Sequence, residues 1–203
     1  MSRLGILMLS ASAMLCAGAI AAGQQGRDLK PVAAFARIAD QRARSVALFR
    51  EIGKVIQHPR CLNCHPRGDR PTQTEAMLPH SPPVLRGATG DGVSGLECAT
   101  CHGSTNAAFA TQRGSVPGDP HWKLAPIEMA WQGYSLGHIC RQISDPARNG
   151  GRSLDKIVDH MANDHLVGWG WHPGSGRIAA PGTQVEFGRL ARAWVDSGAH
   201  CPS

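Results

Sequence analysis

Two copies of one short pattern decide how this sequence is interpreted: CLNCH at residues 61–65 and CATCH at residues 98–102. In each copy two cysteines flank a two-residue gap and a histidine follows directly. This pattern is the attachment signature of c-type haem, in which both thiols form thioethers with haem vinyl groups and the histidine binds the iron. The sequence therefore predicts two covalently bound haem c groups. They would be attached at Cys61, Cys64, Cys98 and Cys101, with His65 and His102 as proximal iron ligands.

A structural zinc site is the main alternative for the same four cysteines, because paired CxxC units are common zinc ligands. Two observations favour haem. Each pair is followed by a histidine that a four-cysteine zinc site does not need, and the interval between residues 64 and 98 exceeds the usual zinc spacing. Two CxxC disulfides are the other alternative.

Residues 1–22 have the pattern of a cleaved export signal. Arg3 supplies a positive start, an apolar run from Leu4 to Ile20 follows, and Ala19-Ile20-Ala21 offers the small residues that signal peptidase recognises. A retained membrane anchor is the alternative, but the run is short for a full span. No later segment is apolar enough to cross a membrane. We therefore expect a periplasmic protein without a stable membrane span after cleavage.

Charge and cysteine count add two further expectations. The chain of 203 residues carries a net charge of +6, but its basic residues are scattered, so no nucleic-acid partner is expected. Of the seven cysteines, Cys16 lies in the export signal and four belong to the repeated pattern. Cys140 and Cys201 remain, and an oxidising compartment favours a disulfide between them. Two free thiols or thiolate ligation of iron are the alternatives.

Periodicity predicts a mainly α fold with long irregular loops. Helices are expected at residues 28–57, with Asp28 as cap and Pro59 as stop, and at 135–144, 153–161 and from the capping box at 183–186 to about 198. Residues 66–97 and 167–182 are rich in Gly and Pro and are expected to be loops. The expected organisation is an N-terminal helix at 23–57 and a dihaem cytochrome c-like domain at 58–203, with the haems forming much of the core.

The second axial ligand of each iron is less clearly marked in the sequence. His80, fifteen residues after His65, is the candidate for the first haem, with Met77 as its rival. For the second haem the candidate is His160, beside the apolar face of its helix, and Met129 is the main alternative. His121 and Met161 are weaker alternatives.

The stretch from His58 to Pro202 resembles a group of small bacterial dihaem cytochromes, some of which are labelled as isoquinoline 1-oxidoreductase subunits. The resemblance rests on PRCLNCHPRGDRPTQ, HSPPVLRG, CATCHGSTN, LAPIEMAW, DPARNGG, HMANDHLVGWGWHPGSGR and GTQVEFGRLARAWVDSGAHCP. It implies a haem protein that takes electrons from a periplasmic molybdenum hydroxylase. This chain itself has no segment resembling a molybdopterin site and is too small for such an enzyme.

The expected function is therefore single-electron transfer between redox donor and acceptor proteins, from a molybdenum hydroxylase to the respiratory chain, with no catalytic residue assigned. The alternative is a dihaem enzyme in which one iron has an open or thiolate-ligated position and reduces peroxide or oxidises a sulfur compound. The abundance of histidines and methionines favours closed iron sites.

Overall fold

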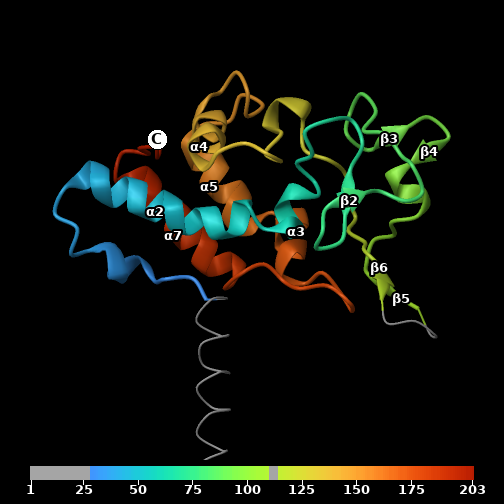
Figure 1. Ribbon diagram of the computed structural model, residues 1–203, viewed down its shortest axis with the longest axis horizontal. Helices are drawn as coiled ribbons and strands as arrows, with labels where there is room; N and C mark the ends of the chain where they lie inside the picture. The colour runs from blue at the N-terminus through green and yellow to red at the C-terminus, as the bar shows by residue number, and fades with distance from the viewer. Residues whose placement is uncertain (1–27, 110–113) are drawn as a thin grey trace, which may run out of the picture.

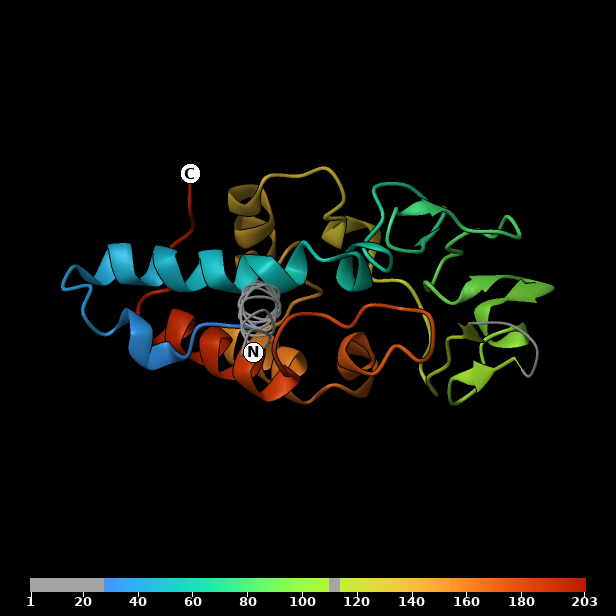
Figure 2. The ribbon, with the colours of Figure 1, turned by 60° about the horizontal axis from the view of Figure 1, so that its bottom comes forward.

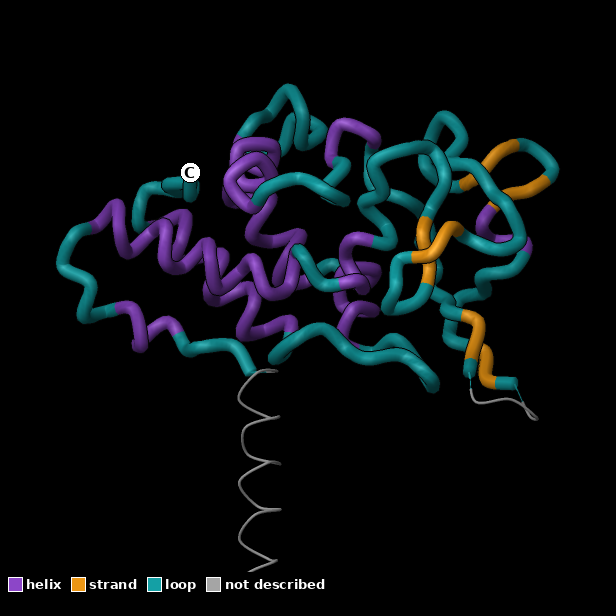
Figure 3. The backbone as a smooth tube through the Cα atoms, in the orientation of Figure 1, coloured by secondary structure: helices purple, strands orange, loops and turns teal. Residues whose placement is uncertain are grey.

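A computed structural model describes residues 28–109 and 114–203, so the predicted export signal and Cys16 lie outside the described residues. The described chain is mainly α, with a helical half and a half made of loops and short hairpins (Figure 1, Figure 3). None of its helices is both long and apolar enough to span a membrane. The α-helices are α2 Gln41–Ile56, α3 Pro59–Leu62, α4 Leu136–Ser144, α5 Leu154–Asn163, α6 His165–Gly168 and α7 Gln184–Asp196.

The first helix is shorter than the sequence predicts. α2 begins at Gln41, because the side chain of Asp40 accepts a hydrogen bond of 2.6 Å from the backbone N–H of Ala43 and caps the helix there. The residues before it form only a 3₁₀ turn, η1 Val32–Phe35, so Asp28 is not the cap. The predicted end is confirmed, since α2 stops at Ile56, ahead of Pro59.

The three later helices begin where their caps predict. Ser135, Ser153 and Thr183 each accept a hydrogen bond from the backbone N–H three residues on, at the starts of α4, α5 and α7. The predicted loop at 167–182 instead begins inside a helical segment. Asp164 caps α6, and a 3₁₀ turn, η4 Trp169–Trp171, continues from it.

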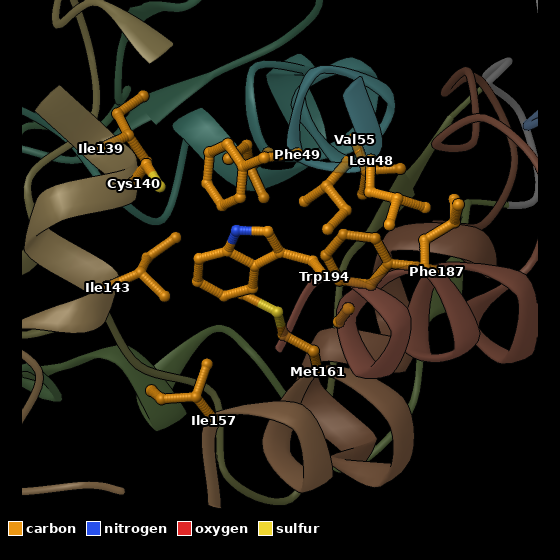
Figure 4. Close-up of a cluster of buried hydrophobic side chains, with 14 of the residues drawn as sticks. Leu48, Phe49, Val55, Ile139, Cys140, Ile143, Ile157, Met161, Phe187 and Trp194 are labelled. Atoms are coloured by element: carbon orange, nitrogen blue, oxygen red, sulfur yellow. The ribbon is translucent and has the colours of Figure 1, made fainter. Parts of the chain in front are cut away.

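Helices α2, α4, α5 and α7 enclose a hydrophobic core centred on Trp194 (Figure 4). The indole of Trp194 is fully buried, and its ring centre lies 4.8 Å from that of Phe49 on α2. α7 packs along both α2 and α5 (Figure 2). α2, which the sequence assigns to a separate N-terminal helix, is thus part of this core.

A disulfide joins Cys140 on α4 to Cys201 beyond the end of α7, with the two Cα atoms 5.5 Å apart. This is the pair that the cysteine count predicts. Cys140 is fully buried against the helical core. The disulfide therefore fixes the C-terminal segment to α4, which lies near it in Figure 1.

The other half of the molecule contains short antiparallel hairpins between long loops, where the sequence predicts loop alone. β1 Thr72–Gln73 pairs with β2 Leu78–Pro79, β3 Gly92–Val93 with β4 Leu96–Glu97, and β5 Ala107–Ala108 with β6 Ser115–Val116. The 3₁₀ turn η2 Cys98–Thr100 lies in this half, whereas η3 Ile127–Met129 packs against α4. Because each strand has only two residues, these hairpins depend on packing against neighbouring loops for their stability.

Candidate functional site

Both CxxCH segments fold as the same helical turn. The backbone N–H of His65 donates to the carbonyl of Cys61 at 3.1 Å, and that of His102 donates to the carbonyl of Cys98 at 2.9 Å. The first turn continues α3, which His58 caps, and the second continues η2. Residues four apart on a helical turn share a face. Each histidine is therefore presented on the same side as the first cysteine of its motif.

The ring of His65 is held by a hydrogen bond and by stacking. Its Nδ1 lies 2.7 Å from the carbonyl oxygen of Met129. A carbonyl only accepts hydrogen bonds, so Nδ1 carries the proton and Nε2 keeps a free lone pair. The indole of Trp131 stacks on the ring, with centres 3.5 Å apart and planes within 6°. His65 is thus fixed in the tautomer and orientation that a metal-binding imidazole needs.

His102 is held in the same way. Its Nδ1 donates to the carbonyl oxygen of Pro117 at 2.7 Å, which again leaves Nε2 available. Trp122 stacks on the ring with centres 4.7 Å apart and planes within 17°. The two motifs therefore share more than their sequence pattern, since each histidine has a backbone carbonyl on Nδ1 and a tryptophan against its ring.

An apolar cavity of about 420 Å³ adjoins the second motif. Cys98, Cys101 and His102 line it, together with Cys64 of the first motif and His80. The two motifs thus border one space. A cavity of this size is in the range of small-molecule and cofactor sites.

His80 lies beside His102, with ring centres 6.0 Å apart. Sequence spacing instead suggests His80 for the first motif. The reason for the difference is that residues 71–80 fold as the β1–β2 hairpin, where the backbone N–H of His80 donates to Pro71 at 3.0 Å. The hairpin carries His80 to the cavity of the second motif.

Two of the other ligand candidates, His160 and Met129, lie near the first motif. Burial lowers the pKa of His65 to about 4, and positive charge on His160 contributes to the lowering, so His160 is in electrostatic range of His65. His160 also places its Nδ1 3.1 Å from a carboxylate oxygen of Asp164. Met129 gives its carbonyl to His65, while its side chain is buried in the helical core. Both residues had been assigned to the second motif from sequence.

None of the four cysteines of the motifs forms a disulfide. Burial raises the pKa of Cys61 to about 12 and that of Cys64 to about 11, and it also raises the pKa of Cys98. Across residues 28–109 and 114–203, no three His, Cys, Asp or Glu side chains converge as a metal-ion site. The four motif cysteines all lie within these ranges, and their side chains do not form the four-cysteine cluster of a structural zinc site.

Two arginines at the cavity were not singled out from the sequence. Arg60 is 4% exposed and lies 2.5 Å from the Glu75 carboxylate through one terminal nitrogen, while its Nε has no hydrogen-bond partner among the described residues. Arg177 lines the same cavity and donates to the side chain of Ser115 at 2.7 Å. Arg60 is marked in the sequence only by its position directly before the first motif.

Comparison of the chain with protein-family models, with curated proteins and with solved structures gives no match in any of the three.

Proposed function

We propose that this protein is a periplasmic dihaem c-type cytochrome that transfers single electrons. The observation that carries the proposal is the repeated geometry at the two motifs. In each, the histidine that follows the second cysteine donates through Nδ1 to a backbone carbonyl at 2.7 Å. A hydrogen bond of this kind fixes the tautomer and raises the basicity of a metal-ligating imidazole.

The residues around the motifs fit a haem. Cys61 and Cys64 would attach one group, and Cys98 and Cys101 the other. Haem carries two carboxylates, which can accept hydrogen bonds from buried donors that have no other partner. Within the described residues, the Nε of Arg60 and the indole N–H of Trp131 are donors of this kind. A bound haem supplies one-electron chemistry between ferric and ferrous iron.

The chain's own contribution would be to orient the groups and to limit their contact with water. Cys64 borders the same cavity as Cys98 and Cys101, so the two attachment sites are neighbours. Such proximity suits the passage of an electron from one site to the other. A molybdenum hydroxylase as donor and a component of the respiratory chain as acceptor complete the proposal, on the strength of the family resemblance.

The test is to express the protein in a host with periplasmic haem maturation and to measure haem per polypeptide and absorbance spectra. We expect two covalent low-spin c-type haems and a mature mass that lacks residues 1–22. The double variants Cys61→Ser/Cys64→Ser and Cys98→Ser/Cys101→Ser serve as matched controls, and each is expected to retain one haem. Absence of covalent haem would overturn the proposal, and a high-spin component in the native protein would favour an enzyme over a carrier.

A further inference from the structure

We infer that His80 and His102 bind one and the same iron from opposite sides, so that the second site is a bis-histidine site. This inference rests on the proposed function and adds the identity of the second axial ligand. It also replaces the assignment of His80 to the first motif that sequence spacing suggests.

The distance between the two rings matches this role. Two imidazoles bound through Nε2 to opposite sides of one metal ion have ring centres about 6 Å apart, because each metal–nitrogen bond is ~2 Å long and each ring centre lies ~1 Å beyond its nitrogen. The ring centres of His80 and His102 are 6.0 Å apart. Their planes meet at 62°, so the rings are not stacked and do not touch face to face.

Both rings also have the same nitrogen available. Nδ1 of His80 lies 2.9 Å from the carbonyl oxygen of Pro82, and Nδ1 of His102 lies 2.7 Å from that of Pro117. Since each carbonyl can only accept, Nδ1 is the donor in both rings, and in a neutral imidazole of this tautomer Nε2 is the nitrogen with the lone pair. His80 therefore has the same hydrogen-bonding arrangement as the proximal histidine that it faces.

The backbone around His80 is fixed by contacts on both sides of the residue. Its N–H donates to the carbonyl of Pro71 at 3.0 Å, and its own carbonyl accepts from the Arg70 guanidinium at 2.6 Å. His80 lines the cavity together with Cys98 and Cys101, which would carry the haem. The ligand would thus be in place before the haem is bound.

The rival candidates are placed less well. His121 is exposed and does not border the cavity, and it is attached through its backbone N–H to the carboxylate of Asp119 at 2.8 Å. Met77, the rival of His80 in the same hairpin, packs against the helical core instead and does not line the cavity either. His80 is therefore the ligand that the geometry selects.

The experiment compares His80→Ala with His121→Ala, both prepared with haem. Native protein and His121→Ala are expected to be fully low-spin and to bind no carbon monoxide when reduced. In His80→Ala, one of the two haems is expected to become high-spin and to bind one carbon monoxide per chain. Added imidazole should return that haem to low spin, a rescue that a purely structural role of His80 would not give.

The outcomes separate the inference from the function on which it rests. If native protein carries two low-spin haems and His80→Ala keeps both low-spin and closed to carbon monoxide, the inference is overturned and the carrier function stands. The same holds if His121→Ala is the variant that opens an iron. If native protein carries no covalent haem, the proposed function and the inference both fail.

Discussion

Removing the disulfide is expected to lower stability by an amount that follows from its position in the chain. The bond joins residues 61 positions apart, from α4 to the segment beyond α7. A crosslink that closes a loop of that length stabilises the folded state by about 4 kcal/mol, since it restricts the unfolded chain. Engineered and native disulfides often give less than this chain-entropy value, so we expect a loss of roughly 3 kcal/mol for Cys201→Ser.

For a chain of this size, ~1 kcal/mol corresponds to a shift of about 2–4 °C in melting temperature, which predicts a decrease of roughly 10 °C. The assay is thermal and denaturant unfolding of Cys201→Ser and native protein, each with and without a thiol reductant. Reductant should lower the native protein to the level of the variant and leave the variant unchanged. The haem spectrum should be the same in both. An unchanged melting temperature would refute the role of the disulfide, and a changed spectrum would show that Cys201 is an iron ligand.

Three further substitutions test the helical core and the cavity wall, each by its denaturant midpoint against native protein. Thr183→Ala removes the hydroxyl that caps α7 by accepting from the N–H of Glu186, and it should lower the free energy of unfolding by about 1 kcal/mol. Thr183→Ser keeps a hydroxyl at this position and should retain the native stability. Gly188→Ala would place a new Cβ 2.5 Å from the Cβ of Ala162 on α5. This crowding outweighs the ~1 kcal/mol gain in helix propensity, so we expect a net destabilisation of about 1 kcal/mol. A more stable variant would contradict the tight α5–α7 contact. Glu75→Gln removes the carboxylate that pairs with the buried charge of Arg60. We expect it to lower the free energy of unfolding by roughly 1–2 kcal/mol, a modest loss because Glu75 is partly exposed. An unchanged midpoint would show that Arg60 has another partner.

The helices could be predicted from the sequence because their signals are local. A serine or threonine whose hydroxyl can accept from the N–H three residues on, followed by apolar residues at helical spacing, marks the starts of α4, α5 and α7. The start of α2 was missed because Asp28 and Asp40 are both plausible caps. Periodicity upstream of Asp40 extended the predicted helix beyond the cap that the structure uses.

The partners of the site histidines could not be predicted, because they are set by contacts between distant residues. The carbonyl that accepts from His65 belongs to Met129, 64 residues along the chain. Nothing in the sequence near either residue marks this hydrogen bond, since any backbone carbonyl can make it. Spacing alone also assigned His80 to the nearer motif, whereas the fold of the β1–β2 hairpin brings it to the farther one.

These contacts place the second site inside the first along the chain. The first motif takes its carbonyl and its stacking ring from Met129 and Trp131, which follow the second motif. The second motif has His80, which precedes it, against its histidine. No cut between residues 65 and 98 would therefore leave His65 in the same fragment as the two residues that hold it. The arrangement differs in this way from two modules joined in tandem, in which each motif would have its partners in its own part of the sequence. It follows that the residues that hold His65 lie on both sides of the second site, so the first site cannot be complete in a fragment that ends before Met129.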